Sequence, residues 1–328
     1  MPANLTARYR KVEDAYRRAA TPEEELTCLQ DMLRELPKHK GTDKLQAELR
    51  QKISKAKHDL ANPSAVKAHS VRIARQGAGQ VLVIGGPNSG KSQLLRALTR
   101  ATPEVGDYPF TTREPSCGMM SFEDILIQLV DTPPVTRDML EPYMQGLIRS
   151  ADLVLLVVDL GSDDGIENCQ ELIERLASTK TGLGTESKLD DQDIGRTFTQ
   201  TFVISNKIDD VAARERLELF HELLPLPFRE FVVSATDQTG LDELRGEVFR
   251  ALDVVRVYTK APSRKEPDLD KPFTLRRGGT LADVAALIHE TVASSFKFGR
   301  VWGKAVHDGT RVKGDYVVHD KDIVEIHC

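Results

Sequence analysis

The chain has 328 residues, of which 40% are hydrophobic and 29% charged, values ordinary for a soluble protein with room for two or three domains. Its longest apolar run near an expected strand, Leu153–Val158, is far too short to cross a bilayer, and the N-terminus has no apolar signal-peptide core. The four cysteines, at positions 28, 117, 169 and 328, lack metal-ligand spacing and fit reduced thiols. We therefore expect a cytoplasmic protein that does not associate with membranes.

The net charge of −5 is unevenly distributed along the chain. Residues 1–75 carry a net charge of +6, residues 76–254 carry −14 and residues 255–328 carry +3. Because a basic surface attracts polyanions, the two ends are the parts expected to meet RNA. The alternative is that these charges only solvate exposed helix faces, and the sequence leaves both interpretations open.

Helical signals dominate residues 1–61. Thr21 can cap a helix that Pro22 opens, and Glu24 completes a capping box. Leucines at helical spacing follow until Pro37, and a second apolar stripe begins at Leu45. Two striped helices with a short link predict an antiparallel hairpin. Its second helix is rich in basic residues, which include Lys52, Lys55 and Lys57.

Residues 62–79 are expected to form a linker that ends in the flexible segment 77–79. Apolar runs and helical stretches then alternate, which predicts an α/β domain with a mainly parallel sheet. The expected strands are 81–84, 125–130, 153–158, 201–204 and 231–233. The segment Ser178–Gln200 has no apolar period, so we expect an exposed loop or a short insertion there.

The C-terminal residues follow a different pattern. Strands are expected at 254–258, 273–275, 300–302, 316–318 and 323–326, and a helix that opens at Thr280 and extends to Val292 precedes the third of them. This order is typical of a small β-grasp module. The segment has no catalytic constellation, so we expect it to bind a partner.

One stretch fits phosphate chemistry closely. It follows an apolar strand, precedes a helix with Leu94, Leu95 and Leu98 on one face, and reads Gly85, Gly86, Pro87, Asn88, Ser89, Gly90, Lys91 and Ser92. The glycines let backbone N–H groups turn toward an anion, and the helix adds its positive end. Lys91 can reach the outer phosphates, and the Ser92 hydroxyl can ligate magnesium. A chance match in an ordinary strand–helix turn is the alternative, and the flanking pattern disfavours it.

Two downstream stretches fit the same chemistry. The segment Asp107–Thr112 should lie in a mobile loop, from which a threonine can complete a magnesium shell. Asp131 ends an expected strand and is placed to hold magnesium through water, although ordinary helix capping is the alternative for such an aspartate.

Two further stretches select the base. Asp209 in the segment Asn206-Lys207-Ile208-Asp209 can accept two hydrogen bonds from guanine N–H groups, a pattern that adenine cannot offer. This motif therefore predicts GTP rather than ATP and disfavours a broad-specificity nucleotidase. The Lys207 stem can pack over the base, and a guanine carbonyl can be reached by the backbone of Ser234, Ala235 and Thr236.

Together these motifs resemble the translation-factor-related GTPases, and the segment Tyr108–Thr112 resembles the Obg superfamily. The segments around Arg256–Lys260, Val301–Gly303 and Asp322–Val324 are similar to the TGS domain of developmentally regulated GTP-binding (DRG) proteins. The resemblance implies a Ras-like P-loop GTPase domain between an N-terminal helical hairpin and a C-terminal β-grasp (TGS) domain. We place these parts at residues 1–75, 76–253 and 254–328.

The resemblance also implies roles for single residues. Thr112 matches the magnesium-binding threonine, so Ser92, Thr112 and Asp131 would hold Mg²⁺, and Lys91, Thr112 and Asn88 would serve catalysis. Asn88 stands where related cation-dependent GTPases use an asparagine to help hold potassium, which implies K⁺ as a second cation. The alternative is that Asn88 only shapes the loop.

Two departures from the family affect hydrolysis and size. The family's Asp-x-x-Gly reads Asp131-Thr132-Pro133-Pro134 here, and Val135 stands where many GTPases have a water-positioning glutamine. The spacing from Asp131 to Asn206 also leaves no room for the extra domain of DRG proteins.

We therefore expect a GTP- and GDP-binding protein that hydrolyses GTP slowly and associates with ribosomes or structured RNA. An accessory protein is a further expected partner, through the TGS domain or the N-terminal helices. The rival hypothesis is a non-hydrolysing, GTP-gated binding scaffold.

Overall fold

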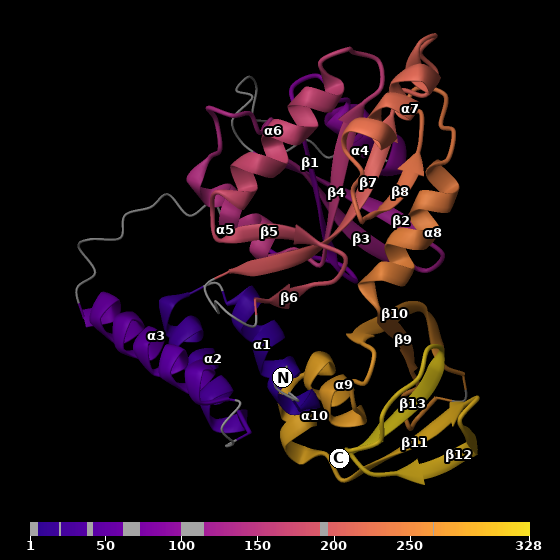
Figure 1. Ribbon diagram of the computed structural model, residues 1–328. Coiled ribbons are helices and arrows are strands. Elements are labelled where there is room, and N and C mark those ends of the chain that lie inside the picture. The colour runs from indigo at the N-terminus through magenta and orange to yellow at the C-terminus, as the bar shows by residue number, and fades with distance from the viewer. Residues whose placement is uncertain are drawn as a thin grey trace.

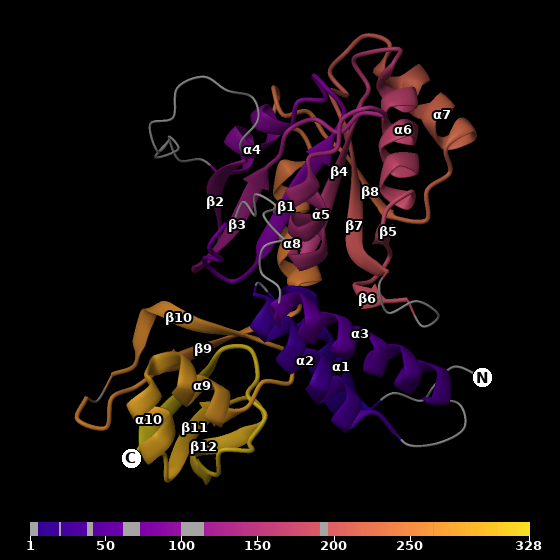
Figure 2. The ribbon, with the colours of Figure 1, turned by 90° about the vertical axis from the view of Figure 1, so that its left-hand side faces the viewer.

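The computed structural model describes residues 6–19, 21–37, 42–61, 73–99, 115–190, 196–264 and 266–328. These residues form a group of N-terminal helices, a larger sheet of eight strands with helices on both faces, and a C-terminal sheet of five strands. The N-terminal helices and the smaller sheet lie side by side against one edge of the larger sheet (Figures 1 and 2). None of the described helices is long and apolar enough to span a membrane.

Three helices make up the N-terminal part: α1 (Ala7–Arg18), α2 (Pro22–Glu35) and α3 (Asp43–Ala61). The expected capping box is confirmed, because the Thr21 hydroxyl accepts from the Glu24 N–H at 3.0 Å and the Glu24 carboxylate accepts from the Thr21 N–H at 3.1 Å. The helices α2 and α3 pack on each other as the expected hairpin, and α1 adds a third helix against α2. Their shared core contains Tyr9, Tyr16, Leu29, Met32, Leu36 and Leu49.

The larger sheet contains all five strands expected between residues 81 and 233. Its order is β2-β3-β1-β4-β7-β5, and β6 and β8 also pair with β7. The pairs that involve β2 and β6 are antiparallel and the others are parallel. The strands are β1 (Gln80–Gly85), β2 (Ser116–Phe122), β3 (Ile125–Asp131), β4 (Leu153–Asp159), β5 (Thr181–Gly184), β6 (Lys188–Leu189), β7 (Thr197–Asn206) and β8 (Arg229–Val232).

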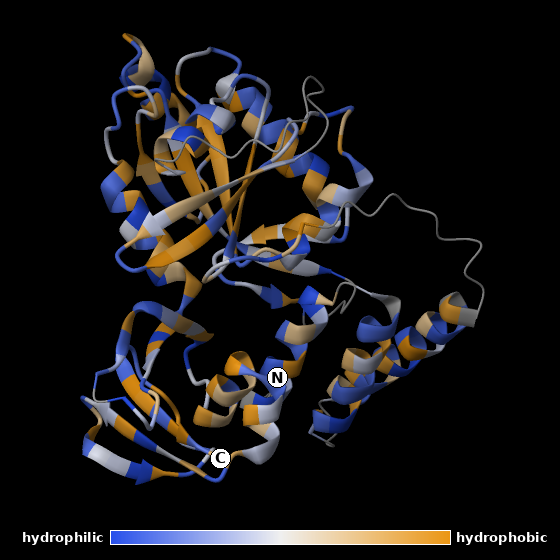
Figure 3. Ribbon diagram, turned by 180° about the vertical axis from the view of Figure 1, so that it is seen from behind, coloured by the Kyte–Doolittle hydropathy of each residue, from blue (hydrophilic) through white to orange (hydrophobic). Residues whose placement is uncertain are grey.

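Helices cover both faces of this sheet. They are α4 (Lys91–Thr99), α5 (Pro142–Ser150), α6 (Gly165–Ala177), α7 (Ala213–Leu223) and α8 (Leu241–Leu252). The helices α4 and α8 bury apolar side chains in a core on one face, while α5, α6 and α7 share a second core on the opposite face. Figure 3 shows that the central strands of the larger sheet are more hydrophobic than the helices that cover it. Parallel strands buried on both faces read as continuous apolar runs, which explains why the sequence predicted them.

The expectation of an exposed loop at Ser178–Gln200 is wrong. The described residues of this segment form β5, β6 and the start of β7. Leu189 of β6 packs into the core of the N-terminal helices, and its N–H donates to the Glu13 carboxylate at 3.1 Å. The buried polar side chains of the segment are Thr181, Thr197 and Thr199. Threonine suits strands through its branched Cβ, so this segment needs no apolar run to pair.

The C-terminal sheet has the order β10-β9-β13-β11-β12, in which only β9 and β13 run parallel. Its elements are β9 (Val254–Thr259), β10 (Asp268–Arg276), α9 (Leu281–Ile288), α10 (Glu290–Ser295), β11 (Phe298–Gly303), β12 (Val306–Val312) and β13 (Asp322–His327). Two expectations need correction. The helix that opens at Thr280 ends at Ile288, so Val292 lies in α10. The segment 316–318 makes a single β-bridge, between Thr280 and Val317, and is not a strand.

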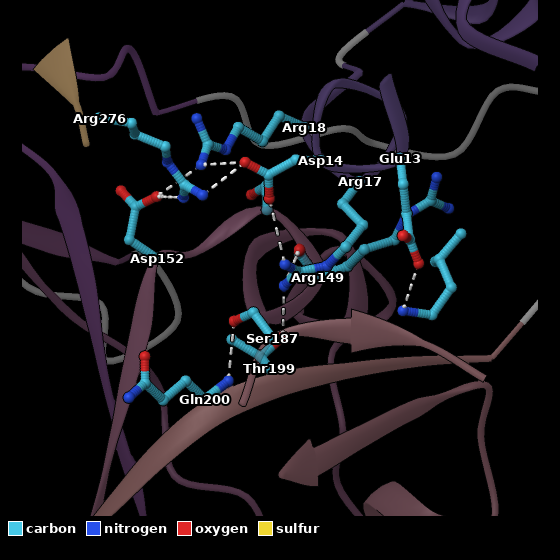
Figure 4. A network of polar contacts seen from close by, with 12 residues as sticks. Glu13, Asp14, Arg17, Arg18, Arg149, Asp152, Ser187, Thr199, Gln200 and Arg276 are labelled. Atoms are coloured by element: carbon cyan, nitrogen blue, oxygen red, sulfur yellow. Dashed lines mark hydrogen bonds and ion pairs between the residues drawn. The ribbon is translucent and has the colours of Figure 1, made fainter. Parts of the chain in front are cut away.

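The three parts of the molecule meet at Asp152, just before β4 (Figure 4). Its side chain is 7% exposed and pairs with Arg18 of α1 at 3.2 Å, with Arg276 of β10 at 2.8 Å, and with Arg75. Asp14 of α1 pairs with Arg18 at 2.9 Å and with Arg276 at 2.5 Å. One buried carboxylate thus joins the N-terminal helices, the larger sheet and the smaller sheet.

A second contact joins the two sheets at the turn between β2 and β3. Arg256 of β9, whose side chain is 4% exposed, pairs with Asp124 at 2.9 Å and with Glu123 of this turn. The same guanidinium pairs at 2.8 Å with Asp320, in the turn before β13, and the Tyr258 hydroxyl donates to Asp124. Both contacts lie where the parallel strands begin, at the end of the larger sheet opposite to the carboxyl ends of those strands.

We expect Asp152→Asn to lower the free energy of unfolding by roughly 2–4 kcal/mol, because three arginines lose the anion that they share at a buried position. Denaturant unfolding followed by circular dichroism measures this loss. Asp253→Asn is the matched control, since Asp253 and Arg277 form a pair in which both side chains are 65% exposed. Such a surface pair contributes about 0–1 kcal/mol. Equal losses in the two variants would contradict the role of Asp152.

Candidate functional site

Five loops meet at the edge where the parallel strands of the larger sheet end. They follow β1, β3, β4, β7 and β8, and they contain residues 85–92, 131–136, 159–161, 206–209 and 234–236. Open α/β sheets bind ligands at this edge. Side chains that stand far apart in the sequence therefore become neighbours, and hydrogen bonds join all five loops into one network.

The loop 85–92 has the backbone of a phosphate-binding loop. Its buried residues are Gly85, Gly86, Ser89 and Lys91, and its exposed residues are Pro87, Asn88 and Ser92. Asn88 and Gly90 have positive φ angles of 57° and 89°. A Cβ on Gly90 would stand 2.4 Å from Nδ2 of Asn206, so both the backbone and the available space require glycine there. The loop then leads directly into the N-terminus of α4.

Lys91 is buried beneath this loop. Its Nζ donates to the carbonyl oxygens of Gly86 at 2.7 Å and Gly85 at 3.2 Å. Burial lowers the pKa of Lys91 from 10.5 to about 8, although the Asp131 carboxylate opposes this shift. The ammonium is therefore held in a place where an added anion would strongly favour its charged form.

Ser92 and Asp131 face each other across the site. The Ser92 hydroxyl donates to Asp131 Oδ2 at 2.5 Å. Burial raises the pKa of Asp131, while the hydroxyl of Ser92 and the charge of Lys91 act in the opposite direction. The other oxygen, Oδ1, is buried and has no hydrogen-bond partner among the described residues. A hydroxyl and a carboxylate with an unused oxygen are the donors that Mg²⁺ prefers, so these two residues fit a magnesium ion.

Asn206 joins the loop 85–92 to the loop 234–236. Its side chain is fully buried, its Nδ2 donates to the Ser89 carbonyl at 3.0 Å, and its Oδ1 accepts from the Ala235 N–H at 3.2 Å. Ser234 is also fully buried, and its hydroxyl accepts from the Asp237 N–H at 2.9 Å. The structure thus gives Asn206 a positioning contact on both sides, which the sequence did not reveal.

A second link crosses the site from α4. Gln93 Nε2 donates to the exposed Thr236 hydroxyl at 3.0 Å. Asp209 differs from these residues, because it is exposed and its carboxylate has no hydrogen-bond partner among the residues that the structure describes. The carboxylate of Asp209, which is expected to bind the base, is thus available for a ligand.

Asp159 is a site residue that the sequence analysis missed. It ends β4, is 5% exposed, and pairs with Lys207 Nζ at 2.7 Å. The only sequence signal that could have found it is a carboxylate at the carboxyl end of an apolar strand, the same signal that singled out Asp131.

The loop after Asp131 offers no unused backbone N–H between positions 133 and 136. Pro133 and Pro134 have none, the Val135 N–H donates to the Gly85 carbonyl at 3.3 Å, and the Thr136 N–H donates to the Met139 carbonyl at 3.0 Å. The Val135 side chain is 1% exposed and belongs to the core beneath α5. The segment Asp107–Thr112, with the expected magnesium ligand Thr112, lies outside the described residues.

We expect nucleotide binding to take up a proton near pH 8.5, because phosphates raise the pKa of Lys91 from about 8. Titration calorimetry of GDP in two buffers of different ionisation enthalpy measures the uptake. At about pH 6.5 Lys91 is already charged and this uptake should vanish.

The lowered pKa of Lys91 also makes the stability of the nucleotide-free fold depend on pH. Between about pH 8 and pH 10.5 the unfolded chain holds a proton that the nucleotide-free fold has lost, so the contribution of Lys91 to stability rises with pH over this window. Below about pH 8 the cost of burying the charge is fully present.

The calorimetry also tests the lowered pKa of Lys91. Proton uptake of equal size at pH 8.5 and at about pH 6.5 would contradict it.

Comparison with known proteins places these features in a family. Residues 80–186 match the family model described as 50S ribosome-binding GTPase, and residues 255–328 match the TGS domain. An uncharacterized GTP-binding protein of Methanocaldococcus jannaschii is 27% identical, in an alignment that covers 93% of this chain and 92% of that protein. This alignment spans 364 positions, more than the 328 residues here, so the relative carries segments that this chain lacks.

Developmentally-regulated G-protein 1 of Arabidopsis thaliana is 26% identical and aligns over 88% of this chain and 87% of its own length. Among solved structures, the YchF GTPase of Schizosaccharomyces pombe matches with a TM-score of 0.52 at 13% identity, over 80% of this chain and 100% of that chain. This last likeness shows the fold alone. The chain thus carries a GTPase domain of the family described as 50S ribosome-binding GTPase and a TGS domain at its C-terminus, and it resembles the developmentally regulated GTP-binding proteins over most of its length.

Proposed function

We propose that the protein binds GTP and GDP and hydrolyses GTP slowly, and that this cycle is coupled to association with ribosomes or structured RNA. The observation that carries the proposal is the position of Asn206, which ties the phosphate loop at Ser89 to the loop at Ala235. A nucleotide bound between these loops would have its phosphates at residues 85–92 and its base at Asp209 and Ser234–Thr236.

The residues divide the work according to their chemistry. The loop 85–92 would bind the phosphates through its N–H groups. The Lys91 ammonium would turn from the carbonyl oxygens of Gly85 and Gly86 to the phosphates. Ser92, Asp131 and Thr112 would hold Mg²⁺, which when bound neutralises charge on the phosphates. Asp209 would accept from guanine, and the Lys207 stem would pack over the base.

Slow hydrolysis is proposed because the site lacks two usual aids. Val135 is buried in the core and cannot orient a water molecule, and the neighbouring prolines offer no N–H to a γ-phosphate. A monovalent cation near Asn88 would offset charge that develops between the phosphates, and we propose K⁺ for this place.

The experiment that tests the function measures phosphate release from GTP with and without ribosomes. Each arm is run in potassium and in sodium buffers of equal ionic strength. Turnover that is slow alone and faster with ribosomes supports the proposal, whereas no turnover in any arm together with tight GTP binding supports the non-hydrolysing scaffold. Equal rates in the two salts would remove potassium from the mechanism.

The basic residues of α3 are the proposed contact with RNA. Arg50, Lys55 and Lys57 are exposed, while Lys52 is half-buried and its ammonium lies 5.7 Å from the centre of the Tyr16 ring. Lys52 is therefore part of the packing of the helices. We place the RNA contact on the exposed face of α3 and on the TGS domain, and an accessory protein would bind through the TGS domain or the N-terminal helices.

Replacing Arg50, Lys55 and Lys57 together by Glu should reduce co-sedimentation with ribosomal subunits and leave GTP affinity unchanged. Each phosphate contact that is lost should also make binding less sensitive to salt. Arg214→Glu is the control, because Arg214 is exposed on α7 of the acidic central part. Undiminished pelleting of the triple variant would move the contact elsewhere.

We also propose the domain boundaries 1–75, 76–253 and 254–328. In support of the last boundary, α8 ends at Leu252, Asp253 has a left-handed backbone, and β9 begins at Val254.

A further inference from the structure

Asp159 uses both of its carboxylate oxygens. The side chain is 7% exposed, Oδ2 pairs with Lys207 Nζ at 2.7 Å, and Oδ1 accepts from the Gly161 N–H at 2.8 Å. A buried carboxylate is costly unless it is paired and hydrogen-bonded, so these contacts keep each other in place. None of the sequence motifs includes this residue.

Lys207 depends on such contacts. Its φ of 66° is uncommon for a residue other than glycine and is retained only where the surroundings hold it. Besides Asp159, its Nζ donates to the Asn88 carbonyl of the phosphate loop at 2.8 Å. The lysine therefore links the end of β4, the phosphate loop and the expected base loop.

The turn after β4 closes on the stem of this lysine. A Cβ on Gly161 would stand 2.8 Å from Lys207 Cδ, and a Cβ on Gly165 would stand 1.9 Å from the backbone oxygen of Asp159. Only glycine fits at these two positions if the turn and the stem keep their places. The packing thus restricts the stem of Lys207, and the ion pair restricts its ammonium.

We propose that Asp159 is a positioning residue for nucleotide binding. It holds Lys207 where the stem can pack on a purine ring and where the ammonium anchors the phosphate loop at Asn88. The inference rests on the guanine-nucleotide site proposed above. Because a stem packed on a ring face does not read the edge of the base, Asp159 controls how long any purine nucleotide stays bound, while Asp209 controls which purine is chosen.

Asp159→Asn isolates the contact with Lys207. The amide keeps an oxygen for the Gly161 N–H but turns an NH₂ group toward the ammonium. We expect fluorescently labelled GDP to dissociate about tenfold to a hundredfold faster, as for the loss of one charge-assisted hydrogen bond, with the preference for guanine over xanthine unchanged. Asp163→Asn is the control, because Asp163 lies in the same turn, is 91% exposed and pairs with Arg216. Its GDP dissociation rate should equal that of the unmodified protein.

A second background separates positioning from a merely structural role. Lys207→Met removes the ammonium but keeps a stem, and it should by itself accelerate GDP dissociation as Asp159→Asn does. In the Lys207→Met background, Asp159→Asn should then change the rate by less than about twofold, because the two groups act as one unit. A full effect of Asp159→Asn in both backgrounds, or an unchanged rate in the single variant, overturns the inference. Failure of the unmodified protein to bind GDP would instead contradict the proposed function.

Discussion

Replacing Asp209→Asn should weaken GTP binding by roughly 2–4 kcal/mol, the cost of losing charge-assisted hydrogen bonds at a bound ligand. The carboxylate would accept from two N–H groups of guanine, whereas an amide presents one donor and one acceptor. The same change should improve the binding of xanthine nucleotides, whose additional carbonyl can meet the new N–H. Competition of GTP and XTP against a labelled nucleotide measures both effects.

Asp210→Asn provides the matched control for this test. Asp210 is the next residue along the chain and is also exposed, but its carboxylate accepts from the Ala212 N–H at 3.0 Å and pairs with Arg216 at 2.8 Å. It should leave base preference unchanged. GTP affinity that is equal in Asp209→Asn and in the unmodified protein would remove Asp209 from the base contact.

Pro134→Gly should raise the preference for GTP over GDP. In the GTPases that the chain resembles, a glycine N–H at this place donates to the γ-phosphate, and proline has no N–H to give. The neighbouring Val135 N–H does not replace it in this structure, because it donates to the Gly85 carbonyl. We therefore expect the unmodified protein to bind GTP and GDP within about tenfold, since one missing charge-assisted bond is worth about 1.5–3 kcal/mol.

The control for this change is Pro133→Gly, which loosens the same loop but places its N–H one residue too early. Affinities for GDP and for a non-hydrolysable GTP analogue, measured by titration calorimetry, give the preference of each variant. If the unmodified protein already prefers the GTP analogue by a large factor and the glycine at 134 adds nothing, Pro134 does not set the preference.

The sequence predicted the parallel strands and the loops at their ends because both signals are local. A strand buried on both faces is a continuous apolar run, and a phosphate loop needs glycines at fixed positions. Thr21 and Glu24 likewise predicted their helix start from neighbouring residues alone, and the capping box is confirmed.

What the sequence missed depends on residues far apart in the chain. The strand β2 (Ser116–Phe122) is the exception, because it pairs with the next strand, β3, and was missed for its irregular pattern of buried and exposed residues. The strand β6 is two residues long, and only its contact with the N-terminal helices explains Leu189. Asp159 pairs with Lys207, which follows the neighbouring strand β7 and lies 48 positions later in the chain. No local pattern encodes such a pair.

The contact between Leu189 and the first helices also has a consequence for how the chain is made. Those helices leave the ribosome before β6, yet their core includes a residue that is synthesised about 150 positions later, which at 5–20 residues per second is a delay of roughly 8–30 s. Arg276, the partner of Asp14, emerges later still. During synthesis the N-terminal helices thus keep part of their apolar surface exposed until Leu189 is made. Their contacts with the rest of the molecule are complete only after Arg276 has been translated.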